Sequence, residues 1–114
     1  MRTALSNGAD INWHYPDVGS FTPLHAAAYY NRSDAVQWLL SNGADLESRN
    51  DAGYTPLMVA AMNGSTQMVT MLLEKGADVA ASDRLGGTAL GYAEQNNHSD
   101  TATILRVHSA SSMN

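Results

Sequence analysis

The sequence repeats one pattern three times, as TPLHAAA at residues 22–28, TPLMVAA at 55–61 and TALGYAE at 88–94. The copies begin at Thr22, Thr55 and Thr88, and the interval between them is constant. A fixed period between about 20 and 50 residues indicates that one supersecondary unit is copied and stacked, so that each unit buries its apolar face against its neighbours. The chain is therefore expected to form an array, with its function on a repetitive surface rather than in an enzymatic cleft.

The second copy is the most regular and predicts how each helix begins. Thr55 followed by Pro56 favours a helix start, because the threonine oxygen can accept from an orphan amide while proline lacks an amide that would stay unpaired. A hydroxyl cap at Ser65 or Thr66 is expected to start a second helix. The apolar residues of that helix cover a wide face and are Met68, Val69, Met71, Leu72 and Leu73.

Glycine and asparagine mark where the helices end. Gly64 suits the left-handed conformation that often closes a helix, and the equivalent positions hold Asn31 and Asn97, the next most tolerant residue type. A second marker, GAD, begins at Gly8, Gly43 and Gly76 and is expected to end the second helix of each unit. Turn-forming residues then lead to the next threonine and predict a projecting hairpin; in the last unit they are Asp83, Gly86 and Gly87.

Two helices, a turn and a hairpin in each period closely resemble the ankyrin repeat. The motifs that carry the resemblance are TPLHAAA at 22–28, LLSNGAD at 39–45 and DAGYTPLMVAA at 51–61. The resemblance covers nearly the whole chain and implies an all-α repeat solenoid, an L-shaped stack of helix pairs with projecting β-hairpin loops. The expected division is a remnant of an N-terminal repeat at 1–12, repeats at 13–45, 46–78 and 79–108, and a disordered tail at 109–114.

The two ends of this array are expected to differ. Glu94 and Arg106 stand where the earlier copies have alanine and leucine, so polar residues replace the face that would meet a fourth repeat. Such substitutions are typical of a capping repeat. The N-terminal remnant shows no equivalent cap. This predicts either a fragment of a longer array or an apolar face covered by a partner or a second copy.

Composition disfavours several classes of function. The net charge is -5 and the six lysines and arginines are scattered, so nucleic acid is not an expected partner. The absence of cysteine excludes disulfides and thiolate metal sites and favours a cytoplasmic protein, with the nucleus as an alternative. The first residues lack the apolar core of a signal peptide. The longest apolar stretch, 54–62, is about half the length that spans a bilayer, so membrane insertion is not expected.

The resemblance implies that a protein or peptide partner binds the concave face, which is formed by the hairpin tips and the exposed side of the first helices. Tyrosine and tryptophan offer large, stiff contact area and are enriched in binding hot spots, and they crowd the first half of this face. Trp38 and Tyr92 are instead expected to pack inside. The expected partner-binding residues are Trp13, His14, Tyr15, Phe21, Tyr29, Tyr30, Arg49, Asp51, Tyr54, Met62, Arg84 and Leu85.

No catalytic, metal or cofactor site is expected. The four histidines occupy unrelated parts of the repeat; the resemblance implies that His25 makes structural hydrogen bonds between neighbouring repeats and that His98 is a structural residue. No serine is paired with a histidine and an acid in a way that nucleophilic catalysis requires. The stretch LSNGADIN at 5–12 is similar to the asparagine hydroxylation site of many ankyrin-repeat proteins, with Asn12 as target, although the hairpin uses the same residues structurally.

Two alternatives to partner binding stay open at this point. The chain could be an architectural or targeting segment of a larger protein whose activity lies elsewhere. It could also be an assembly module that associates with itself through its uncapped N-terminal face. The sequence does not identify a partner, because ankyrin surfaces bind unrelated targets and a fold does not fix a function.

Overall fold

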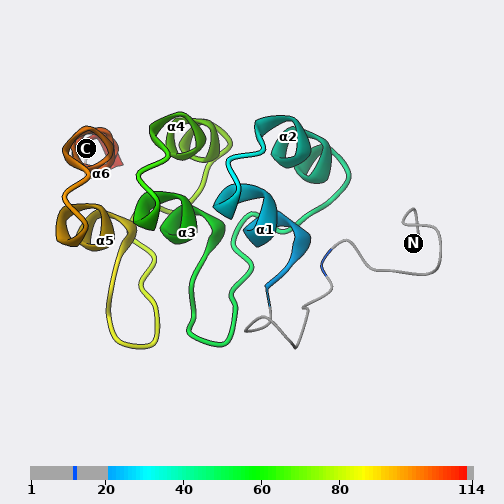
Figure 1. The fold of residues 1–114 in the computed structure, drawn as a ribbon, viewed down its shortest axis with the longest axis horizontal. Helices are drawn as coiled ribbons and strands as arrows, with labels where there is room; N and C mark the ends of the chain where they lie inside the picture. Colours follow the sequence, from blue (N-terminus) through cyan, green and yellow to red (C-terminus); the bar gives the residue numbers. More distant parts are fainter. Residues whose placement is uncertain (1–11, 13–20, 113–114) are drawn as a thin grey trace.

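The structure, a computed structural model, describes Asn12 and residues 21–112 (Figure 1). Within residues 21–112 the helices form three successive pairs, which are α1 (Pro23–Tyr29) with α2 (Ser33–Ser41), α3 (Pro56–Met62) with α4 (Thr66–Glu74), and α5 (Ala89–Gln95) with α6 (Ser99–Ser112). The first helices of the pairs lie in one row and the second helices in another, and the long loops project on the side of the first row. This arrangement confirms the predicted all-α repeat solenoid.

The first helix of each pair begins with a threonine cap, as predicted. The hydroxyl oxygens of Thr22, Thr55 and Thr88 accept from backbone amides three residues further along the chain. In the first pair the cap is reciprocal, because the backbone amide of Thr22 also donates to Nδ1 of His25 at 3.2 Å. Because the same cap recurs at the same position of every repeat, the three helices start in register.

The same three helices end in the predicted left-handed conformation. The φ angles are 58° at Asn31 and 64° at Asn97, and Gly64 takes 68°. The residue that follows each of them donates its amide back to a carbonyl five residues earlier, at 2.8 to 3.1 Å, which is the Schellman arrangement. These tight turns reverse the chain, so that the second helix of each pair runs back along the first.

The prediction of a hydroxyl cap at Ser65 or Thr66 is wrong. Helix α4 begins at Thr66, and Ser65 in the cap position makes no side-chain hydrogen bond to it. The tight turn holds Ser65 at ψ 81°, which is far from the extended conformation of the three capping threonines. The Thr66 hydroxyl instead contacts the hydroxyl of Thr101 on α6 at 3.1 Å, which ties two neighbouring second helices together.

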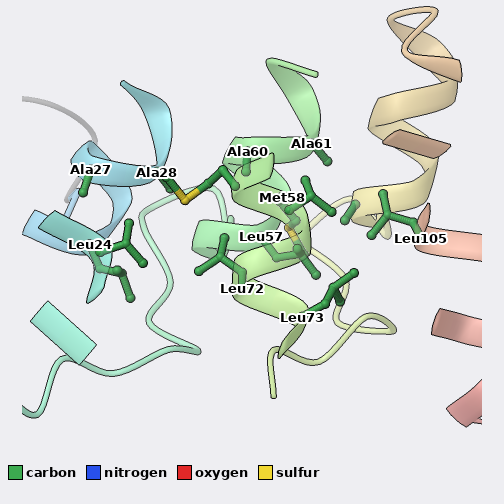
Figure 2. Close-up of a cluster of buried hydrophobic side chains, with 14 of the residues drawn as sticks. Leu24, Ala27, Ala28, Leu57, Met58, Ala60, Ala61, Leu72, Leu73 and Leu105 are labelled. Atoms are coloured by element: carbon green, nitrogen blue, oxygen red, sulfur yellow. The ribbon is translucent and has the colours of Figure 1, made fainter. Parts of the chain in front are cut away.

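The core runs along the whole stack between the two rows of helices (Figure 2). Leu24, Leu57, Leu72 and Leu105 come from successive pairs and are almost completely buried in one cluster. Small residues line the contacts between the first helices of the pairs. Ala28 on α1 and Ala60 and Ala61 on α3 have no exposed surface. Each repeat therefore depends on its neighbour for burial, as the constant period predicts.

The C-terminal end is closed by a polar pair. Arg106 Nη2 lies 2.6 Å from Glu94 Oε2, and both side chains are about half exposed.

The prediction of a disordered tail from Ser109 is wrong as far as Ser112, because α6 continues to that residue. The physical reason is that no glycine or proline stands between Arg106 and Ser112 to break the helix.

One side chain organises each described hairpin. Asn50 Oδ1 accepts from the amides of Ala52 and Tyr54 at 3.0 and 2.9 Å. Asp83, at the equivalent position of the next hairpin, accepts from the amides of Leu85 and Gly87 at 2.9 and 2.8 Å. The third hairpin also has an isolated antiparallel bridge between residues 82 and 88. The sequence places two more residues between Asp10 and Thr22 than between Asp45 and Thr55, which predicts a longer first hairpin; this hairpin lies largely outside the described residues.

Candidate functional site

The predicted binding surface is partly visible in the structure. Trp13, His14 and Tyr15 lie outside the described residues, so the structure says nothing about this part of the prediction. The remaining predicted residues divide into an aromatic group on α1 and a group on the two described hairpins. Their surroundings differ, and only some of them present an open surface.

The aromatic group lies along one side of α1. Phe21, His25 and Tyr29 are four residues apart and therefore share a helix face. Phe21 stacks on His25 with ring centroids 5.2 Å apart, and its other neighbour is the Tyr29 ring at 6.5 Å. Tyr30 meets Tyr29 edge to face at 4.9 Å. This cluster fixes Tyr29 while leaving 47% of its surface exposed, so it offers an already ordered aromatic contact.

His25 holds the cluster in place and is a structural residue. It is completely buried, and its Nε2 lies 2.7 Å from the backbone oxygen of Tyr54 in the next repeat. Because Nδ1 accepts from the amide of Thr22, Nε2 carries the proton and donates to that oxygen. His98 makes a similar contact, with Nε2 3.0 Å from the backbone oxygen of Met62. The His25 contact confirms the predicted hydrogen bond between neighbouring repeats, and the His98 contact confirms that His98 is a structural residue.

Two aromatic residues do not lie where the sequence prediction placed them. Trp38, expected to pack inside, is 49% exposed, so that prediction is wrong. It lines a groove of about 560 Å³ together with Tyr30, at the end of the stack formed by α1 and α2. Tyr30, predicted for the concave face, therefore also borders this end face. Trp38 stays exposed because no described helix covers the side of α2 on which it lies.

Tyr54 and Tyr92 form a second aromatic contact between hairpin and helix. Their ring centroids lie 5.8 Å apart at 78°, which confirms that Tyr92 is a packing residue. The Tyr92 hydroxyl donates to Asp83, and this hydrogen bond holds the pKa of the Asp83 carboxyl below its usual value although burial opposes the shift. The same hydrogen bond raises the pKa of the Tyr92 hydroxyl. Tyr54, predicted as a partner-binding residue, is thus partly used in holding the hairpins.

Two predicted binding arginines tie neighbouring hairpins together. Arg49 donates through Nη1 to the backbone oxygens of Gly53 at 2.9 Å and Ser82 at 2.7 Å. Arg84 donates through Nε to the backbone oxygen of Asp51. These bonds fix the tips of the hairpins relative to each other. The side chains of both arginines therefore help to hold the two hairpins together.

Residues at the hairpin tips and at the end of α3 differ in how much of their surface is exposed. Leu85 at the tip of the third hairpin is 93% exposed, and Asp51 at the tip of the second is also exposed. Met62 is half-buried at the end of α3. Beside it, Asn63 donates through Nδ2 to the backbone oxygen of Tyr29 at 2.8 Å, a link that the next repeat copies with Asn96.

The side chain of Asn12 is held by two hydrogen bonds in the stack. Its Nδ2 donates to the backbone oxygen of Gly43 at 3.3 Å, and its Oδ1 accepts from the amide of Asp45 at 2.8 Å. Glu47 accepts from the amide of Asp78 at 2.8 Å in the same way one repeat later. These side-chain links between repeats were not predicted. The sequence indicates them only through the donor amides, because Asp45 and Asp78 hold the same place in successive GAD motifs.

The described part of the chain holds neither a metal-binding cluster nor a membrane-spanning helix. Among those residues no group of three or more histidine, aspartate or glutamate side chains could hold a metal ion. In the same part of the chain no helix has the length and apolar character needed to cross a membrane. What the described residues form is an ordered surface with exposed aromatic and apolar side chains.

Comparison with known proteins agrees with this architecture. The family described as "Ankyrin repeats (3 copies)" matches residues 1–50 and 24–114. The chain is similar to Arf-GAP with coiled-coil, ANK repeat and PH domain-containing protein 2 from Rattus norvegicus and from Mus musculus, at 38% identity over 53 residues in each case. The matched segment covers 46% of this chain and 7% of each relative. On the family match and the repeated helix pairs, the chain belongs to the ankyrin repeat family.

Proposed function

We propose that this chain binds a partner protein or peptide through an inner surface formed by Phe21, Tyr29, Met62, Asp51 and Leu85. Ankyrin repeats are generally protein-interaction modules, and the repeats here supply the frame for such a surface. The observation that carries the proposal is the ordered aromatic cluster on α1. Tyr29 is fixed by rings on two sides and is still 47% exposed.

A preordered surface favours binding because little side-chain freedom is lost on association. Arg49 and Arg84 hold the two described hairpins together, and the Asn63 link joins the ends of α1 and α3. The partner would meet aromatic and apolar side chains at the centre and polar groups at the rim, which is the usual anatomy of an interface. Tyr29 and Leu85 are the expected anchors.

The proposal is tested by isolating partners with the 114-residue chain as bait and then measuring the affinity of the strongest partner for variants. Tyr29→Ala and Leu85→Ala should each weaken that affinity by at least tenfold, as expected for interface anchors. Val107→Ala is the matched control, because Val107 is an exposed apolar residue on α6, in the other row of helices. Affinities within twofold of the unsubstituted chain for both variants, with the fold intact, would exclude this surface.

A second candidate function is an architectural or targeting role within a larger protein. The printed name of the rat relative combines ANK repeats with Arf-GAP, coiled-coil and PH elements, and the matched segment is a small part of its length. Under this alternative the chain serves mainly as a spacer, and the isolated chain captures no partner that Tyr29→Ala releases. For the compartment we propose the cytoplasm or nucleus, supported by the complete lack of cysteine.

A further inference from the structure

The two ends of the stack differ in chemistry. The C-terminal end carries the exposed ion pair between Glu94 and Arg106. The opposite end, formed by α1 and α2, carries the apolar groove of about 560 Å³. Its walls are mainly apolar and consist of Pro23, Ala26, Ala27, Tyr30, Ala35, Trp38 and Leu39, with Arg32 at one side.

The groove occupies the face with which a repeat normally packs on its predecessor. In the second repeat the positions that correspond to Ala26 and Ala35 hold Val59 and Met68, and both of these are buried. In the first repeat Ala35 is exposed and Ala26 is only half-buried. The small side chains leave a hollow where the second repeat has bulky ones. Whatever covers this face must therefore insert a large apolar side chain.

A large apolar side chain, that of Trp38, lies on the same face beside the hollow at Ala35. Trp38 follows Ala35 by three residues on α2 and leaves 49% of its surface open. The small side chains of Ala26, Ala27 and Ala35 line the groove, so an indole ring that enters it would lie against alanine methyl groups. A two-fold symmetric interface requires a surface that carries both a projection and the hollow that receives it. This face meets that requirement.

Charge on the rim agrees with a two-fold arrangement. Arg32 lines the groove, and Asp34 lies one helical turn before Trp38, so that it neighbours the projecting ring. Both residues are exposed, and the ion pair found within the described residues involves other side chains. When Trp38 of one copy enters the groove of the other, its Asp34 approaches the Arg32 of that second copy.

We infer that two copies of this chain associate through the end face of α1 and α2, each inserting Trp38 into the alanine-lined groove of the other. The polar pair at the C-terminal end disfavours the alternative of head-to-tail stacking into a filament, because that contact would bury Glu94 and Arg106 against apolar residues. The association is distinct from partner binding on the inner surface, since it uses neither Tyr29 nor Leu85.

Sedimentation equilibrium of the 114-residue chain tests this inference from about 1 µM to about 1 mM. The average mass should rise from 12.2 kDa toward twice that value. Trp38→Ser should weaken association at least tenfold, as for an interface hot spot, while Val107→Ser, which removes another exposed apolar side chain, this one from α6, should not. Circular dichroism confirms that each variant is folded.

Charge reversal tests the two-fold pairing itself. Arg32→Glu and Asp34→Arg should each weaken association, and the double variant should restore it, because the opposite charges then meet again across the interface. A monomer throughout the concentration range would overturn the inference, and this result includes the case in which other residues of the same chain cover the face. Association unchanged by Trp38→Ser, or a double variant no stronger than the single ones, would overturn it equally. Leu85→Ala should leave self-association intact, which separates this test from that of the proposed function.

Discussion

Gly64→Ala tests whether the turn between α3 and α4 needs glycine for two separate reasons. The first is the backbone, because Gly64 has a φ angle of 68°, in the left-handed region that side chains disfavour. The second is space, because a Cβ atom at this position would lie 2.5 Å from Nδ1 of His98 and 2.7 Å from two other ring atoms. Either the His98 ring or the turn must move to accept the methyl group.

The expected loss of stability follows from these two effects. A side chain in the left-handed conformation costs about 1 to 2 kcal/mol. Displacing the His98 ring also breaks its hydrogen bond to the backbone oxygen of Met62, which contributes about 0.5 to 1.5 kcal/mol. Together they predict that Gly64→Ala lowers the free energy of unfolding by about 1.5 to 3.5 kcal/mol.

Gly86→Ala is the matched control for this measurement. Gly86 has a φ angle of 83°, close to that of Gly64, but an added Cβ would meet no atom within 4 Å, so only the backbone effect applies. Urea unfolding followed by circular dichroism gives the free energy of unfolding of each variant. Gly64→Ala should be more destabilising than Gly86→Ala by about 1 kcal/mol, and this excess should disappear when His98 is also replaced by alanine. Equal effects of the two single variants would refute the role given to His98.

Three other predictions concern stability. Thr55→Ala removes the cap on the Met58 amide and should cost about 1 to 2 kcal/mol in urea unfolding, whereas the exposed Thr103→Ala should cost less. Leu72→Ala should cost about 2 to 5 kcal/mol because its side chain is completely buried, and a loss below that range in the same assay would contradict its place in the core. Because the pKa of Asp83 is lowered in the folded chain, its carboxylate stabilises the fold above the unfolded value of 3.8, and this contribution is lost as the pH falls toward the folded pKa. Asp83→Asn should therefore lose less stability between neutral and acid pH than the unsubstituted chain, and identical losses would count against the shift.

Local chemistry made the helix boundaries predictable. Capping at Thr55 and the left-handed turn at Gly64 depend on residues that are adjacent in sequence, and both are confirmed. The cap expected from Ser65 fails because the preceding turn fixes its backbone away from the capping conformation. At Ser65 the geometry of the turn between α3 and α4 therefore outweighs the local preference of serine for capping.

Contacts between distant segments were less predictable. The exposure of Trp38 depends on what precedes the first repeat, which its own sequence does not reveal. Arg49 and Arg84 could be assigned to the hairpins, but their bonds to backbone oxygens of the other hairpin depend on how closely the hairpins stack. The aromatic cluster lies between these cases, because the spacing of Phe21 and Tyr29 predicts a shared face while the stacking on His25 required the folded chain.

Hydrogen exchange of the chain with and without its captured partner tests whether that partner covers the inner surface. Binding should slow exchange in residues 21–30, 49–54 and 82–88, which contain the α1 cluster and the two described hairpins. Exchange in the outer helices α2 and α4 should change little. Slowed exchange confined to those outer helices, with none at α1 or the hairpins, would contradict the claim.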